Sequence, residues 1–116
     1  VSLDNTFETK NYQLVDTISV TYIKNKYQLN NIDILKLDIE GVADIVILDC
    51  LDNKIFPKQI CFELERPYAI SRQYEFYKRV NNLNEKLKKF YDIYFYTDQK
   101  KGIRIELLTI LKSNFS

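Results

Sequence analysis

The chain contains no histidine in its 116 residues. Histidine is the general base of the common serine and cysteine triads and a frequent zinc ligand, so its absence excludes those triads and the common zinc sites. Any acid–base chemistry within this chain must therefore use aspartate, glutamate, lysine, tyrosine or cysteine.

Cysteine is scarce as well, because Cys50 and Cys61 are the only two. Their spacing forms no metal motif, and two cysteines make no disulfide framework. One lies in a predicted helix and the other in a predicted strand, so we expect two reduced, buried thiols. With no secretory signal at the start, this cysteine usage predicts a cytoplasmic location. The chain begins with Val1 rather than methionine, which we interpret as a processed or excerpted sequence.

The sequence also lacks an excess of charge and a long apolar run. Its formal net charge of +1 gives no electrostatic basis for binding nucleic acid or an anionic membrane. A membrane span needs about 20 apolar residues, and no run approaches that length. The hydrophobic share of 46% is typical of a globular chain. We predict a lead-in over 1–11 and one domain over 12–116, with neither nucleic acid nor membrane as a partner.

What the sequence does contain is an alternation of strand and helix patterns. The predicted strands cover 12–20, 32–40 and 58–65, and the predicted helices cover 21–30, 41–54 and 71–91. Two more strands within 92–111, around a glycine-containing loop, form a predicted antiparallel hairpin. This order predicts an α/β fold with a mainly parallel sheet flanked by helices and the hairpin at its edge.

Apolar spacing predicts which helix faces are packed. In the helix over 41–54 the predicted packed residues are Val42, Ile45, Leu48 and Leu51, with Asn53 as the stop. In the helix over 71–91 they are Tyr74, Tyr77, Val80, Leu83, Leu87 and Phe90 or Tyr91, with Ser71 as the N-cap. Tyr68, Tyr74 and Tyr77 are also candidates for a binding surface, although packing in the core or at its boundary is the interpretation that we favour.

Carboxylates gather at the ends of two predicted strands. In "ILKLDIEG" the side chains of Asp38 and Glu40 share one face, and Gly41 follows them. Glu63 and Glu65 share one face at the end of the next strand. If the two strands are parallel neighbours, these carboxylates meet in the crevice where open α/β sheets bind ligands. Gly41 would permit positive φ at a tight strand-to-helix turn.

Two other interpretations of this cluster stay open. Lys36 could pair with Asp38 or Glu63, while Glu40 lies in the favourable first turn of the next helix, which would make the charges structural. A carboxylate-bound Mg²⁺ or Ca²⁺, as in a metal-dependent hydrolase, fits the ligand type, although the spacing fixes no geometry.

The stretch "IDILKLDIEG", followed by a short helix and "FPKQICFELE", resembles the FkbM family of methyltransferases. Members carry a strand of the form D-[IL]-[LI]-K-[IL]-D-[IV]-E-G, then a helix, then a strand that ends in an acidic residue. The matching positions here are Asp33, Lys36, Asp38, Glu40, Gly41 and Glu63. The resemblance covers roughly residues 12 to 111.

The resemblance implies a Rossmann-like class I fold that transfers a methyl group from S-adenosylmethionine to a hydroxyl of a small-molecule or sugar acceptor. It implies Asp38, Glu40 and Glu63 as catalytic residues that orient the acceptor, one of them as general base. Asp38 and Gly41 would contact the cofactor. It implies no metal.

Two departures from the family pattern change what we expect of this chain. Ala43 stands where members usually have an acidic residue, and no glycine-rich strand and turn precedes the motif. The chain then corresponds to the C-terminal half of a methyltransferase domain, inactive alone. Its 32–40 strand would have an open edge, which we expect to be covered by 12–20 or by a second copy in a homodimer. The alternative is a non-catalytic interaction or assembly module that retains the fold.

Overall fold

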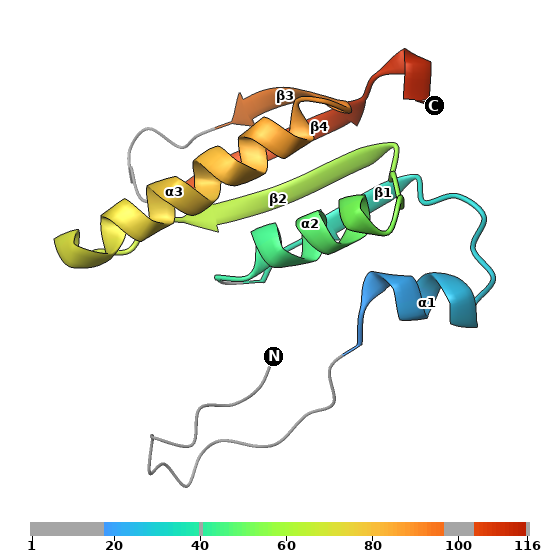
Figure 1. Cartoon of the computed structure of the whole chain (residues 1–116), viewed down its shortest axis with the longest axis horizontal. Helices are drawn as coiled ribbons and strands as arrows, with labels where there is room; N and C mark the ends of the chain where they lie inside the picture. The colour runs from blue at the N-terminus through green and yellow to red at the C-terminus, as the bar shows by residue number, and fades with distance from the viewer. Residues whose placement is uncertain (1–17, 40, 97–103, 116) are drawn as a thin grey trace, which may run out of the picture.

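The computed structural model describes residues 18–39, 41–96 and 104–115 (Figure 1). Its elements in chain order are α1 (Val20–Lys26), β1 (Ile34–Leu37), α2 (Ala43–Asp52), β2 (Gln59–Glu65), α3 (Ile70–Leu87), β3 (Tyr91–Tyr96), β4 (Arg104–Leu111) and the short 3-10 helix η1 (Ser113–Phe115). This order confirms the predicted α/β alternation from α1 onward. The predicted strand over 12–20 lies outside the described residues up to 17, and Val20 belongs to α1 instead.

The four strands form one mixed sheet with the order β1-β2-β4-β3. β1 pairs with β2 in parallel, whereas β4 runs antiparallel to both β2 and β3. The expected mainly parallel sheet is thus corrected, because the second strand of the hairpin lies between β2 and β3 and supplies two antiparallel pairings. The predicted hairpin itself is confirmed. Since β1 and β2 are parallel neighbours, their carboxyl ends lie at the same end of the sheet.

Helices α2 and α3 lie side by side over one face of this sheet (Figure 1). The face beneath them carries the alternate buried residues of β2, which are Ile60, Phe62 and Leu64. They form the core together with Ala43, Ile47, Leu83, Leu87, Tyr91, Leu107 and Leu111. The opposite face is covered by no helix in the part of the chain that the structure describes. The predicted flanking by helices therefore holds for one face only.

The packed faces of α2 and α3 agree with the predicted ones in part, because Leu48, Leu51, Val80, Leu83 and Leu87 all pack against the core. α2 buries Ala43, Asp44, Ile47 and Cys50, while Ile45 is exposed. In α3 the stripe against the sheet consists of Phe76, Val80, Leu83 and Leu87. Tyr68 and Tyr74 are 80% and 70% exposed, so the favoured prediction of core or boundary packing is wrong for both, whereas Tyr77 is 43% exposed and its ring contacts that of Phe76. The reason is that two apolar stripes are interleaved along α3, and tertiary packing selects the more aliphatic one.

The helix ends are set by capping groups, some of which were predicted. Asn53 ends α2 as predicted, and its side-chain amide donates to the Asp49 carbonyl. Ala69, rather than Ser71, is the N-cap of α3 and makes no side-chain cap hydrogen bond. Tyr91 begins β3 instead of ending α3, and its buried hydroxyl donates to the Pro57 carbonyl at 2.6 Å.

Both cysteines are free thiols, with Cys50 buried in α2 and Cys61 half-buried on β2. Within the described ranges, no helix combines the length and the apolar character needed to cross a membrane.

Candidate functional site

The carboxyl ends of β1 and β2 bring Asp38 and Glu63 together, as the sequence predicted. The register places Leu37 beside Phe62, so the next residues along the two strands are Asp38 and Glu63. On the face away from the helices both of them line a hollow of about 480 Å³. The remaining residues that line it are Lys36, Leu37, Cys61, Phe62, Glu106, Leu107 and Leu108. The sheet end thus presents an exposed carboxylate, Asp38, next to a half-buried one, Glu63.

Glu106 joins this pair from β4 and was not among the predicted site residues. The antiparallel register places Glu106 directly opposite Glu63. Sequence reasoning missed it because the order of strands in the sheet, which decides that β4 is the neighbour of β2, has no local signature.

Gly41 turns the chain from β1 into α2. Its φ is 77°, the left-handed region that glycine adopts at no steric cost, which confirms the predicted positive φ. No atom lies within 4 Å of the position that a Cβ on Gly41 would occupy. The turn therefore leaves open space beside the backbone at the end of β1.

The other predicted site residues do not lie together in one hollow. Glu40 lies outside the described residues. Glu65 lines a second hollow, on the helix side of the sheet, which Gly41 and Glu63 also border. Asp38 and Gly41 therefore border different hollows, and Glu63 borders both.

A partly buried ion pair connects α3 to this end of the sheet. The Arg79 guanidinium donates from Nε to Asp44 Oδ2 at 2.9 Å and from Nη2 to Asp44 Oδ1, and Nη2 also donates to the Gly41 carbonyl at 2.7 Å. The side chain of Asp44 is 10% exposed and that of Arg79 is 47% exposed. The hydrogen bond to Asp44 raises the pKa of Arg79, so the guanidinium stays charged.

Sequence reasoning missed this pair because its members are 35 residues apart. One signal was available at Ala43, where the FkbM pattern that the sequence resembles has an acidic residue. Ala43 is only 2% exposed, and the first-turn carboxylate of α2 is the next residue, Asp44. That position favours a negative charge because it lies at the positive end of the helix dipole.

The second hollow, on the helix side, has a volume of about 380 Å³. It lies between the first turns of α2, the N-terminal half of α3 and the end of β2. Its apolar lining comprises Ala43, Leu64, Pro67, Phe76 and Val80. Its polar lining comprises Gly41, Asp44, Glu63, Glu65, Ser71, Arg72, Glu75 and Arg79.

The two alternative interpretations of the charged strand ends find no direct support. Among the residues that the structure describes, the salt bridges join Lys58 to Asp33, Arg79 to Asp44 and Lys88 to Glu85, and Lys36 takes part in none. The same residues include no group of three or more carboxylate or thiol side chains placed to hold a metal ion.

Two other titratable groups are buried away from the strand ends. Burial, with the nearby Asp49 charge, raises the pKa of the Cys50 thiol to about 11. Burial also raises the pKa of Tyr91. At neutral pH Cys50 is therefore a protonated core thiol, not a nucleophile.

The carboxylates of Asp38 and Glu63 can accept hydrogen bonds from hydroxyl or amino groups of a ligand at the sheet end. Comparison of the chain with protein-family models and with curated proteins finds no match in either case.

Proposed function

We propose that this chain is the C-terminal half of an FkbM-type, S-adenosylmethionine-dependent O-methyltransferase domain and is inactive alone. The acceptor would be a hydroxyl of a small molecule or sugar. The observation that carries the proposal is the position of Asp38 beside Glu63, beyond the carboxyl ends of two parallel strands. The positive φ of Gly41 at the following turn agrees with the resemblance that the sequence shows.

The position of β1 supports the proposal as well. β1 is an outer strand of the sheet, and no described strand pairs with its free edge. In open α/β sheets ligands bind where the strand order reverses, beyond the carboxyl ends of two central strands. A further parallel strand along β1 would create such a point directly beside Asp38.

The residues at this end fit the chemistry of methyl transfer to oxygen in part. S-adenosylmethionine, when bound, supplies an activated methyl group. The carboxylate of Asp38 would accept hydrogen bonds from cofactor or acceptor, and the open space at Gly41 leaves room for close approach. One of Asp38, Glu40 and Glu63 would take the proton of the acceptor hydroxyl, while the others hold that hydroxyl in line.

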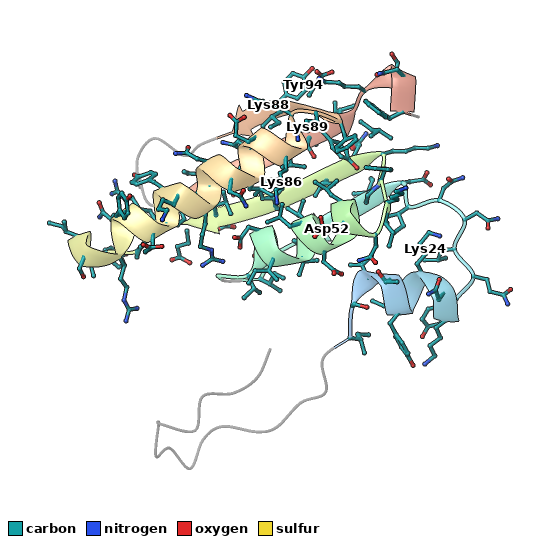
Figure 2. The ribbon with its side chains drawn as sticks, in the orientation of Figure 1. Lys24, Asp52, Lys86, Lys88, Lys89 and Tyr94 are labelled. Carbon is teal, nitrogen blue, oxygen red and sulfur yellow. The ribbon has the colours of Figure 1, made fainter. Side chains whose placement is uncertain are left out.

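Calorimetric titration of the 116-residue chain with S-adenosylhomocysteine tests the proposal. Half of a site retains part of the binding free energy, so we expect a dissociation constant of about 1 mM, which corresponds to about 4 kcal/mol. Asp38→Asn should abolish the heat. Asp52→Asn is the matched control, because Asp52 lies at the far end of α2, exposed to solvent (Figure 2). A folded chain that gives no heat, or an Asp38→Asn variant that binds as the unmodified chain does, would contradict the proposal.

A non-catalytic assembly module is the alternative, and one observation favours it. Tyr68, Ile70, Tyr74 and Tyr77 expose an aromatic and aliphatic stripe along the start of α3. Single exposed apolar residues are common, whereas a contiguous stripe is typical of a contact surface. The free edge of β1 offers a second route to self-association, the predicted homodimer.

Sedimentation equilibrium without any cofactor decides between the two contact surfaces. Tyr74→Ser should dissociate an assembly made through α3, and Ile34→Lys, which places a charge on the exposed β1, should dissociate one made through the strand edge. A monomer at every concentration would rule out self-assembly as the function.

A further inference from the structure

The helix-side hollow, between the first turns of α2 and the N-terminal half of α3, has the size of a small-molecule site. Its volume of about 380 Å³ lies within the range of about 300–1,000 Å³ that is typical of ligand pockets. An apolar cavity of about 150 Å³ is enough to hold benzene. The hollow therefore has room for one aromatic ring and a short substituent.

The floor of the hollow is apolar. It comes from Leu64 on β2 and from Phe76 and Val80 on α3. Side chains alternate between the two faces of a strand, and Leu64 is buried on the face beneath the helices. The carboxylates of Glu63 and Glu65 accordingly extend on the opposite face, and these two residues border the hollow with their backbone. A sugar, which is polar all round, would leave hydroxyl groups unpaired against this floor.

The charged side chains around the hollow balance one another. The Arg79 guanidinium holds the Asp44 carboxylate through two hydrogen bonds, so neither charge is left for a ligand. Arg72 and Glu75, exposed at the rim and three residues apart on α3, carry opposite charges. A charged group that entered the hollow would lose hydration and meet no excess of the opposite charge. The hollow therefore favours an uncharged molecule.

Arg79 also supplies hydrogen-bond donors at the wall of the hollow. A guanidinium has five N–H donors, and Asp44 and the Gly41 carbonyl accept those of Nε and Nη2. The two donors on Nη1 form no hydrogen bond with the described residues, and the side chain is 47% exposed. These donors can bind a hydroxyl or carbonyl oxygen, which brings no charge with it.

We propose that this hollow binds a small uncharged molecule with an apolar body the size of one aromatic ring and a hydroxyl or carbonyl oxygen. The apolar body lies on Phe76 and Val80, and the oxygen accepts a hydrogen bond from Arg79. The site does not depend on methyl transfer, and Asp38 does not border it.

Titration with three probes that share a phenyl ring and a two-carbon linker tests the proposal. These are 2-phenylethanol, 2-phenylethylamine and 3-phenylpropionate, which are neutral, positive and negative at pH 7. Followed by amide chemical shifts, the alcohol should bind about tenfold more tightly than either ion, a difference of about 1.4 kcal/mol. The shifts should gather at Leu64 and along 72–80.

One pair of variants tests the place of binding. Ser71→Trp fills the hollow from an exposed lining position and should weaken binding of the alcohol at least tenfold. Asn82→Trp is the matched control, because Asn82 is exposed on α3 outside the hollow, and it should leave the affinity unchanged.

A second set of variants tests the balance of charge at the rim. Arg72→Gln leaves Glu75 without an opposite charge and should raise the affinity for the amine about threefold, as exposed ion pairs do. Glu75→Gln should raise the affinity for the propionate by the same factor. Glu106→Gln makes the same change on the other face of the sheet and should alter neither affinity.

An ion that binds the unmodified chain as tightly as the alcohol, or alcohol binding that survives Ser71→Trp, would overturn the proposal. Absence of binding by all three probes to the folded chain would overturn it too. If Ser71→Trp turned a dimer into a monomer while no probe bound, the hollow would belong to self-assembly instead. Each outcome is independent of the proposed methyltransferase activity, because the expected S-adenosylhomocysteine binding depends on Asp38.

Discussion

At the residue scale, the Asp44 carboxylate is buried in the first turn of α2 and pairs with the Arg79 guanidinium. Burying a charge costs free energy, and pairing recovers it only where the geometry is good. Here the pairing is bidentate, while the half-exposed Arg79 keeps part of its contact with water. The pair therefore contributes less than a fully buried one, but removing one partner leaves the other in an unfavourable place.

We expect Arg79→Ala to lower the free energy of unfolding by about 2 kcal/mol, below the 3–5 kcal/mol of fully buried pairs because Arg79 is half-exposed. Urea unfolding measures the change. Lys78→Ala, which removes the neighbouring exposed charge, should change it by less than about 0.5 kcal/mol. The double variant of Arg79→Ala with Asp44→Ala should lose less than the two single variants add up to. An Arg79→Ala variant as stable as Lys78→Ala would contradict a stabilising role for the pair of Asp44 with Arg79.

The pKa of Cys50 gives a pH dependence with a definite sign. In the folded chain it is about 11, against 9.0 for an exposed thiol. Between these pH values the unfolded chain loses the thiol proton that the folded chain retains, so stability falls as pH rises from about 9 to about 11. The difference between these two pKa values limits the loss of stability to about 3 kcal/mol.

Chemical denaturation at several alkaline pH values measures this loss. Cys50→Ala should flatten the decline, and Cys61→Ala, which alters the half-buried thiol, should not. The buried hydroxyl of Tyr91, whose pKa is also raised, would leave a residual decline in both variants. Identical pH profiles for Cys50→Ala and Cys61→Ala would show that Cys50 is not the titrating group.

At the scale of single elements, the turn between β1 and α2 depends on Gly41. We expect Gly41→Ala to lower the free energy of unfolding by about 1 kcal/mol, because a residue with a Cβ is strained at positive φ. Open space around the position makes the loss purely one of backbone strain. Gly41→Asn is the matched control and should lose less, since asparagine tolerates this region better. Equal losses for both variants would point to a role of the bare backbone beyond φ.

The elements show how far the sequence could predict this fold. The three helices and the terminal hairpin follow from local periodicity and lie within a few residues of their predicted bounds, whereas β1 covers only Ile34–Leu37 of the strand predicted over 32–40. The sequence could not predict that β4 lies between β2 and β3, because strand order depends on contacts between distant segments. The packed face of α3 was predicted correctly at Val80, Leu83 and Leu87, but Phe76 packs there in place of Tyr74, because spacing alone does not distinguish two interleaved apolar stripes.

Some residues of the candidate site could be predicted from the sequence and others could not. Asp38 and Glu63 could be placed together in advance, because parallel strands carry their carboxyl ends to one edge. The sequence could not predict the place of Glu106 or the pairing of Asp44 with Arg79, since each depends on a contact between elements far apart in the sequence.

At the scale of the whole molecule, the sheet is covered on one face, and β1 has a free edge among the described residues (Figure 1). Parallel strands in α/β proteins are normally covered on both faces, and open edges are normally paired or blocked. Both features agree with a half-domain that completes its site against further structure beside β1. They agree equally with self-assembly, which the sedimentation experiment tests.

The most direct test of the proposed cofactor edge is to map S-adenosylhomocysteine onto the amide resonances of this chain. We expect the largest chemical-shift changes at Leu37, Asp38, Gly41 and Glu63, and we expect them to disappear in Asp38→Asn but persist in Asp52→Asn. Changes that gather on α1 or β3 instead, or no changes at ligand concentrations well above about 1 mM, would contradict the account.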